Sequence, residues 1–149
     1  MPQLARHALV LALAASAPAT LAAQGARKAA SASAAVQEFM RAVADSNLTR
    51  MAELFGTSKG SSAVTHKPDD YQKRMVVIQA MIGKVQSRTL GDLPGKDGMH
   101  TITTQLQRGT CKIVIPVNAV DSKDGWLVHD FDLSAASQVN QSCTGGNGT

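Results

Sequence analysis

The chain has 149 residues, a formal net charge of +4, 44% hydrophobic residues and 17% charged residues. This length predicts one domain, and the hydrophobic content excludes a disordered chain. Phe, Tyr and Trp make up 3% of the residues, too few for a platform on which single-stranded nucleic acid stacks. Lys and Arg are scattered rather than gathered in runs, so we expect no nucleic-acid partner.

The first 23 residues have the layout of a secretory signal peptide. Arg6 precedes an unbroken run of small apolar residues, 8–17, and further small residues follow in 18–23. An apolar run of about ten residues is too short to cross a bilayer. We expect cleavage within Ala19–Gln24, export to the periplasm or the exterior, and no membrane span in the mature chain. A buried N-terminal helix is the alternative interpretation.

Cys111 and Cys143 are the two cysteines of the chain. In an oxidising compartment, an even number of cysteines favours a disulfide, which here would connect the C-terminal segment to a core strand. Two buried thiols, or an intermolecular bridge through Cys143, are the alternatives. The pattern has no C-x-x-C pair and its histidines are scattered, so we expect no metal site. The histidines of the mature chain are His66, His100 and His129.

The mature chain begins with helical periodicity. Apolar residues recur at i, i+3, i+4 and i+7, first from Val36 and again from Leu48, with turn residues between the two runs. Pro68 fits the first turn of a further helix. The expected segments, in order, are a flexible linker 24–35, helices 36–43 and 48–55, a loop 57–67 and a third helix 71–82.

Beyond Gly83 the period changes from 3.6 to 2 residues, which is typical of strands. Arg108-Gly109 joins two alternating runs and predicts a tight hairpin. Pro116 cannot donate to a strand ladder and indicates an edge or a bulge. The expected strands are 84–90, 99–107, 110–120 and 126–133, followed by a polar tail 135–149. Helices before strands predict an α+β fold, with about three helices packed on an antiparallel sheet of about four strands.

Three segments of the helical half and the last strand carry a family resemblance. They are VQEFMRAV (36–43), DSNL (45–48), MAELFG (51–56) and GWLVHDFDL (125–133). Together they resemble the NTF2-like (cystatin-like, cone-shaped) superfamily, especially its small exported bacterial members of unknown function. The resemblance places the domain at 36–134. It implies a curved sheet wrapped around helices, a cone-shaped pocket and, in many members, a dimer formed through the sheet's outer face.

Enzymes of that superfamily, among them steroid isomerases, polyketide cyclases, dehydratases and epoxide hydrolases, place Asp, His, Tyr or Arg in the cone. None of their catalytic motifs matches this sequence residue by residue, so no catalytic role is carried over. Regular alternation gives the last strand a helix-facing set, Leu127, His129, Phe131 and Leu133. The set expected on the partly solvated face is Trp126, Val128, Asp130 and Asp132.

Three side chains are candidates for a site. His129 is either a general base inside the cone or a core histidine bonded to backbone. Asp130 with Asp132 is either an acid–base pair or part of a solvated face. Tyr71 either offers its hydroxyl to a ligand or is a core ring. Arg74 and Arg88 are partners for an anionic ligand, or surface residues.

The leading hypothesis is a non-catalytic binding protein without a cofactor, whose partner is a small apolar ligand or an envelope protein. The first alternative is an NTF2-like enzyme of the isomerase, cyclase or dehydratase type with His129 or Asp130 as its base. The second alternative is a structural interaction module that forms a homodimer through the outer face of the sheet. An enterable hollow with a titratable group inside it would favour the enzyme.

Overall fold

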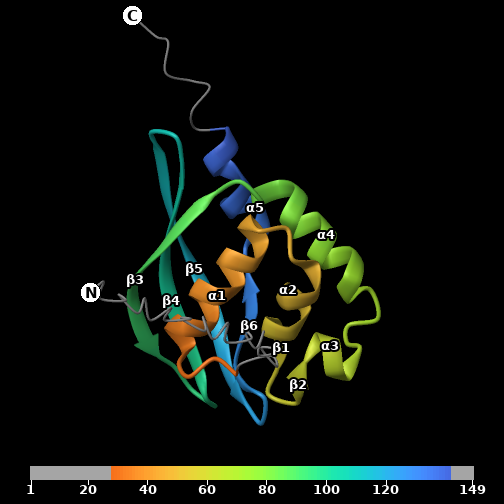
Figure 1. Ribbon diagram of the computed structural model, residues 1–149. Helices are drawn as coiled ribbons and strands as arrows, with labels where there is room; N and C mark the ends of the chain where they lie inside the picture. The colour runs from red at the N-terminus through yellow and green to blue at the C-terminus, as the bar shows by residue number, and fades with distance from the viewer. Residues whose placement is uncertain (1–27, 142–149) are drawn as a thin grey trace, which may run out of the picture.

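The computed structural model describes residues 28–141; the expected signal peptide, residues 24–27 of the expected linker and Cys143 lie outside them. The described residues form an α+β fold with a four-stranded antiparallel sheet and several helices (Figure 1). This is the class that the order of helical and alternating segments predicts.

The first two long helices begin at side-chain caps. The Ser31 hydroxyl accepts a hydrogen bond from the backbone N–H of Ala34, and the Asn47 side chain accepts one from that of Arg50. The first helix therefore begins at Ala32, before the expected start at 36, and residues 32–35 are helix rather than linker. The helices are α1 (Ala32–Ala44), α2 (Leu48–Leu54), α3 (Ser62–Thr65), α4 (Tyr71–Ile82), α5 (Leu133–Ser137) and the 3-10 helix η1 (Gln138–Asn140).

The structure has more helices than the three expected. The expected loop 57–67 contains α3 and two short paired strands, β1 (Gly56–Thr57) and β2 (Gly60–Ser61). The last strand ends at Phe131, so Leu133, expected in that strand, begins α5, and α5 and η1 run into the expected polar tail, where Ala136 and Val139 are fully buried. Helices of three to five residues are too short to show a periodic pattern in the sequence. They are stabilised by tertiary contacts rather than by local spacing.

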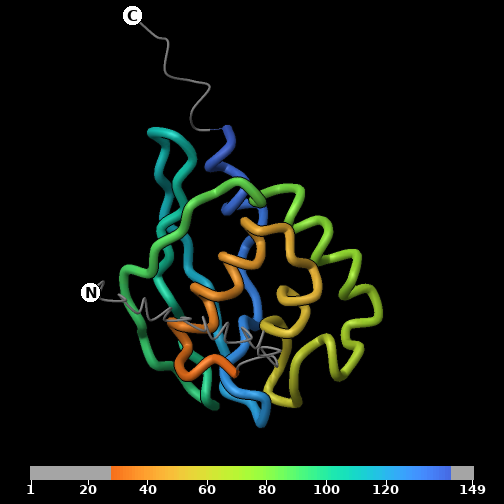
Figure 2. Tube along the Cα trace, viewed as in Figure 1, coloured from red at the N-terminus to blue at the C-terminus, as the bar shows by residue number. Residues whose placement is uncertain are grey.

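The four long strands follow one another across the sheet. They are β3 (Gln86–Pro94), β4 (Met99–Arg108), β5 (Cys111–Ser122) and β6 (Gly125–Phe131). Each pairs antiparallel with the next, in the order β3-β4-β5-β6. Figure 2 shows the chain passing from the end of α4 into the edge strand β3. The expected β4–β5 hairpin is present, with Gly109 at φ +58° in its turn.

Pro116 lies where β5 is locally an edge. The pairing of β6 with β5 runs from Ser122 to Val117, whose partner is Phe131. Pro116 is the next residue, and its partner on the other side is Thr103 of β4. Pro116 therefore sits outside the β5–β6 pairing, as its missing N–H requires. The expectation of a local edge is confirmed.

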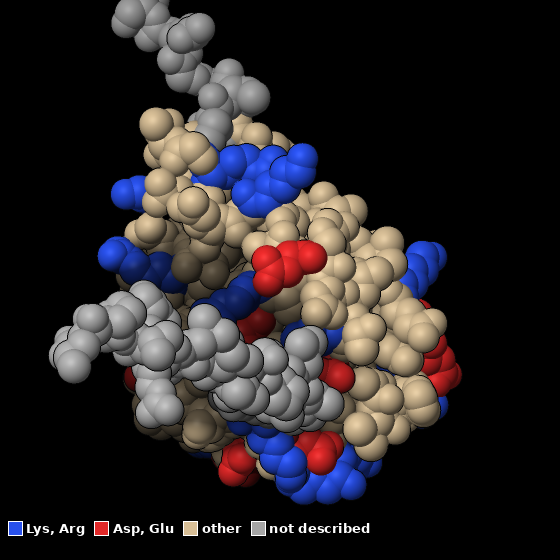
Figure 3. All heavy atoms as spheres, in the orientation of Figure 1, with Lys and Arg blue, Asp and Glu red and all other residues tan. Residues whose placement is uncertain are grey.

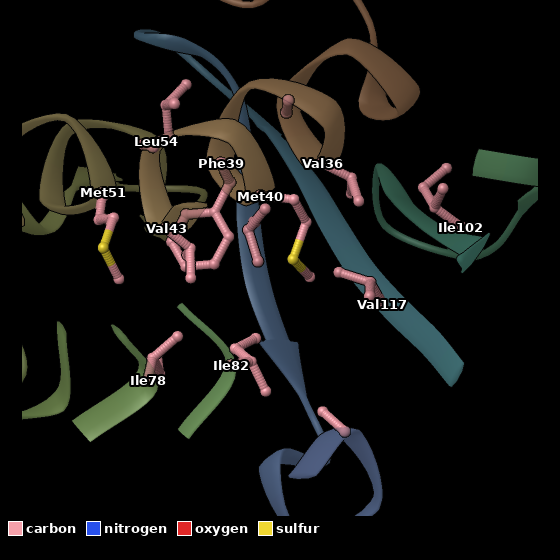
Figure 4. Close-up of a cluster of buried hydrophobic side chains, with 14 of the residues drawn as sticks. Val36, Phe39, Met40, Val43, Met51, Leu54, Ile78, Ile82, Ile102 and Val117 are labelled. Atoms are coloured by element: carbon pink, nitrogen blue, oxygen red, sulfur yellow. The ribbon is translucent and has the colours of Figure 1, made fainter. Parts of the chain in front are cut away.

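The core lies between the sheet and the helices. Helix α1 runs along one face of the sheet and contacts all four strands, while α2 packs on both α1 and α4 (Figure 1). Phe39 is fully buried, with its ring centroid 6.0 Å from that of Phe55 and 6.2 Å from that of Phe131. Figure 4 shows side chains of α1, α2, α4, β4 and β5 meeting there: Val36, Met40, Val43, Met51, Leu54, Ile78, Ile82, Ile102 and Val117.

A β-bulge in β6 changes which residues face this core. Asn118 pairs with Asp130, but Ala119 pairs with Val128, so His129 is an extra residue without a partner on β5. The extra residue reverses the alternation, because side chains otherwise change face at every step. Phe131 faces the core as expected. Val128 is also in the core and fully buried, so its expected place on the solvated face is wrong.

Candidate functional site

An open cleft of about 510 Å³ lies between α4, with the loop before it, and β6, with β1 beside it. Pockets for small molecules usually measure about 300–1,000 Å³. The apolar part of its lining consists of Phe55, Pro68, Val77, Ile78, Phe131 and Leu133. Phe55 and Phe131 are the two rings against which Phe39 packs, so the buried core supports the cleft from behind.

The loop before α4 is held by a buried hydroxyl. Ser62, fully buried, donates a hydrogen bond to the carbonyl oxygen of Lys67, with the two oxygens 2.7 Å apart. The carbonyl oxygen of Pro68 accepts a hydrogen bond from the N–H of Tyr71, the first residue of α4. Both contacts satisfy polar groups that the loop would otherwise leave without partners. They fix the wall of the cleft that faces β6.

His129, the extra residue of the bulge, lines the cleft, on the side where regular alternation also predicted it. Its Nδ1 lies 2.9 Å from the carbonyl oxygen of Gly56 in β1, and the ring is partly buried. A carbonyl oxygen only accepts hydrogen bonds, so Nδ1 carries the hydrogen. In the neutral ring, Nε2 is then a hydrogen-bond acceptor. The bulge thus presents an imidazole with a defined tautomer at the cleft lining.

Asp130 is the next residue of β6 and also lines the cleft. Its Oδ1 accepts a hydrogen bond from Nδ2 of Asn118 at 2.6 Å, and Asn118 Oδ1 accepts one from the Thr101 hydroxyl at 2.9 Å. This chain of two hydrogen bonds crosses β4, β5 and β6 and restrains an exposed carboxylate. Asp132 does not join it, because its side chain caps α5 by accepting the N–H of Ala135. The two carboxylates therefore do not form an acid–base pair.

The wall formed by α4 and its loop carries the cations. Arg74 Nε lies 2.9 Å from Asp70 Oδ1, one helical turn earlier. Lys67 Nζ lies 2.5 Å from Asp69 Oδ1. The hydrogen bond from Lys67, together with its positive charge, holds the pKa of Asp69 below its ordinary value. Lys73 lines the cleft and has no ion-pair partner among the described residues.

Tyr71 lies apart from the other two candidates. Its ring is partly buried against the core, and its hydroxyl is 3.5 Å from Nδ1 of His66. It lines a second hollow of about 370 Å³, where α2 and α4 meet, together with Leu48 and Val76. The structure therefore brings His129 and Asp130 to one cleft and places Tyr71 in another.

Most residues that line the cleft were not among the sequence candidates, and Gly56, Phe55 and Lys73 are examples. The carbonyl of Gly56 and the ring of Phe55 come from a segment interpreted as a helix end. Lys73 had no distinguishing signal, because exposed lysines are frequent on helices.

The signal that pointed to this region was Pro68, expected in the first turn of the third helix. The structure places Pro68 in the loop, because α4 begins at Tyr71 with Asp70 as its N-cap. Arg74, considered as a partner for an anion, does line the cleft.

On the face seen in Figure 3, Lys and Arg lie in separate groups among other residues and form no continuous patch of positive charge. Within residues 28–141, no three His, Cys, Asp or Glu side chains are grouped so as to hold a metal ion. Across the same residues, no helix has the length and apolarity that a bilayer crossing requires. Cys111, at the start of β5, is not a free thiol, but Cys143 lies outside the described residues and their pairing stays a prediction.

The fold and the cleft define a small α+β domain with an open hollow at the side of its sheet. No protein-family model matches the chain, and no curated protein or solved structure matches it either.

Proposed function

We propose that this chain is an exported binding protein that holds a small, largely apolar ligand in the cleft between α4 and β6 without transforming it. The observation that carries the proposal is the cleft itself: its volume suits one small molecule, and most of the surface that lines it is apolar. Val77 is 40% exposed, which leaves apolar surface open to a ligand at the mouth of the cleft.

The same proposal takes the domain to be NTF2-like. The order of its elements supports this: α1 and α2, then the short strands β1 and β2 with α3, then α4, and then four long antiparallel strands in sequence. Export rests on the signal-peptide layout of residues 1–23. Intact-mass analysis of protein from the outer compartment tests it: a start near Gln24 supports export, and an intact Met1 contradicts it.

Two adjacent valines of α4 give a matched test of the cleft. Val76 and Val77 are both exposed, but Val77 lines this cleft and Val76 lines the second hollow. The probe is 1-N-phenylnaphthylamine, a neutral dye whose fluorescence rises in apolar surroundings. Val77→Asp should reduce dye binding at least tenfold, because a carboxylate resists desolvation, while Val76→Asp should leave it unchanged. Equal binding by both variants, or no binding by the unmodified protein, contradicts the proposal.

A second candidate, the enzyme, is favoured by one observation. The bond from His129 to Gly56 leaves Nε2 as an acceptor, the form that a general base requires. Compounds that bind should be incubated with the protein and analysed by mass spectrometry. Conversion that disappears in His129→Asn supports the enzyme, whereas unchanged ligand supports binding alone.

The outer face of the sheet supports an interaction module less well. Near the β4–β5 hairpin, the residues of β3, β4 and β5 that pair with one another on this face are Gln86, Arg88, Gln105, Gln107, Lys112 and Val114. Apart from Val114, these side chains are polar, whereas a stable dimer face is usually apolar at its centre.

A further inference from the structure

One flank of α4 lines the cleft, and that flank carries charged side chains. Residues three and four apart lie on the same side of a helix, which places Lys73, Arg74 and Val77 in one row with the N-cap residue Asp70. All four line the cleft. The other flank, with Val76, lines the second hollow. The helix and its cap thus present two cations and one carboxylate to the cleft.

The guanidinium group of Arg74 is only partly used by its acidic neighbour. Its Nε lies 2.9 Å from Oδ1 of Asp70, and both side chains are 55% exposed. A guanidinium group has further N–H donors on its two Nη atoms. Within residues 28–141, neither Nη atom of Arg74 makes a hydrogen bond. These donors are open to an acceptor in the cleft.

Lys73 gives the cleft lining one positive charge that the protein does not neutralise. Lys67, the third cation of the lining, pairs with Asp69, and Arg74 pairs with Asp70. In the described part of the chain, no carboxylate lies within 4.0 Å of the Lys73 ammonium group. An excess of one positive charge matches a ligand with one negative charge.

The side chains of the β6 wall add neither a countercharge nor a hydrogen-bond donor for an anion. The carboxylate of Asp130 is hydrogen-bonded to Nδ2 of Asn118 on the outer face of the sheet, away from the cleft. His129 donates its Nδ1 hydrogen to the carbonyl oxygen of Gly56, so Nε2 of the neutral ring is an acceptor. An acceptor does not bind a carboxylate. An anionic group in the cleft therefore binds at the α4 wall.

We infer that the ligand is a monocarboxylate with an apolar body, such as an arylalkanoic acid; this rests on the proposed function of the cleft. Its carboxylate lies between Lys73 and the Nη atoms of Arg74, because the Arg fork matches the two oxygens of a carboxylate. Its apolar body lies against Phe55 and Phe131, the rings that Phe39 supports from the core.

Two compounds that share a phenylpropyl body test the sign of the ligand charge on the mature protein. They are 4-phenylbutanoate, an anion, and 4-phenylbutylamine, a cation. Each is titrated into protein that holds the neutral dye 1-N-phenylnaphthylamine, and the loss of fluorescence gives its affinity. The carboxylate should bind at least about fourfold more tightly than the amine, because attraction and repulsion at an exposed site each change affinity by a factor of about two to five. Salt at about 1 M should remove most of this preference, since it shortens the Debye length to about 3 Å.

Substitutions in and near α4 assign the preference to the cleft. Lys73→Met should lower the ratio of carboxylate to amine affinity at least about fourfold, whereas Lys73→Arg, which keeps the charge, should retain the ratio. Asp70→Asn should raise it, because the amide oxygen still accepts the Nε hydrogen of Arg74 but no longer offsets its charge. Lys84→Met, at an exposed position outside the cleft lining, removes the same charge as Lys73→Met and should leave the ratio unchanged. Urea midpoints equal to that of the unmodified protein establish that the variants fold.

The outcomes distinguish this inference from the proposed function. If the dye binds and the amine displaces it as well as the carboxylate does, or neither displaces it, the inference is overturned and the binding cleft stands. If Lys84→Met lowers the ratio as much as Lys73→Met, the preference comes from the net charge of the protein, and the inference is also overturned. If the dye does not bind, the proposed function fails, and this inference fails with it.

Discussion

Nδ1 of His129 lies 2.9 Å from the carbonyl oxygen of Gly56, so the bulge of β6 is tied directly to β1. The two residues are 73 positions apart in the chain. Beside this bond, Phe55 bridges Val128 in parallel, so the end of α2 also meets β6. Both contacts lie at the cleft, and they join the wall that carries His129 to the helical half of the domain.

His129→Ala should lower the free energy of unfolding by about 1–3 kcal/mol. The substitution removes the donor for the carbonyl oxygen of the buried Gly56, and an acceptor left without a partner loses most of its solvation. Urea denaturation measures the change. His129→Asn retains an N–H donor and should recover part of the loss. Identical stability of the Ala variant and the unmodified protein would show that water replaces the ring without penalty.

Gly56→Ala should destabilise the protein by about 1–3 kcal/mol or more through overpacking, while Gly91→Ala should change stability by less than about 1 kcal/mol. A Cβ on Gly56 would lie 2.4 Å from the carbonyl oxygen of Gly60 and 2.8 Å from Cα of Ser61. At Gly91 the nearest atoms belong to Thr103 at 3.9 and 4.0 Å. Thermal unfolding of both variants gives the comparison, and similar midpoints would contradict it.

Lys67→Gln should return the pKa of Asp69 toward its ordinary value of 3.8. In the unmodified protein the hydrogen bond from Lys67 and its charge keep that pKa lower, which favours the ionised carboxylate. This interaction therefore supports the fold at pH values above 3.8 and is lost as the pH falls through the lowered pKa. Carboxyl carbon shifts in an NMR titration measure it. Lys59→Gln is the control, and titration of Asp69 at its ordinary value in the unmodified protein would refute the pairing.

Reduction of the predicted Cys111–Cys143 bridge should lower the free energy of unfolding by about 3–4 kcal/mol, because it would close a loop of about 33 residues. The bridge is compatible with the packing of η1 against β4 and β5, because Cys143 follows Gln141 by two residues in the sequence. Cys143→Ser should match the reduced protein in urea. The unreduced protein should weigh about two hydrogens less than the reduced form. Thiol labelling without reduction would argue against an intramolecular bridge.

The fold class followed from the periodicity of the apolar residues and from the turn residues between the periodic segments. The apolar spacing from Leu48 predicted α2 nearly to its ends, and the spacing from Val36 predicted α1 except for its first turn, residues 32–35, which we expected in the linker. The hairpin at Arg108-Gly109 and the local edge at Pro116 followed from what Gly and Pro do to a backbone. These signals are local, because helix and strand periods are properties of neighbouring residues.

The cleft was decided by tertiary structure. One extra residue in the β5–β6 pairing placed Val128 in the core, because register is fixed by the partner strand rather than by the strand's own sequence. The short helices α3 and α5 form because tertiary packing compensates for the small number of hydrogen bonds within each helix. Lys73 and His129 line one cleft because α4 lies beside β6. The sequence alone determined that helices pack on one face of an antiparallel sheet, because the period of the apolar residues sets which side of each element is buried. Which polar groups face the cleft was decided only by contacts between segments that are far apart in the sequence.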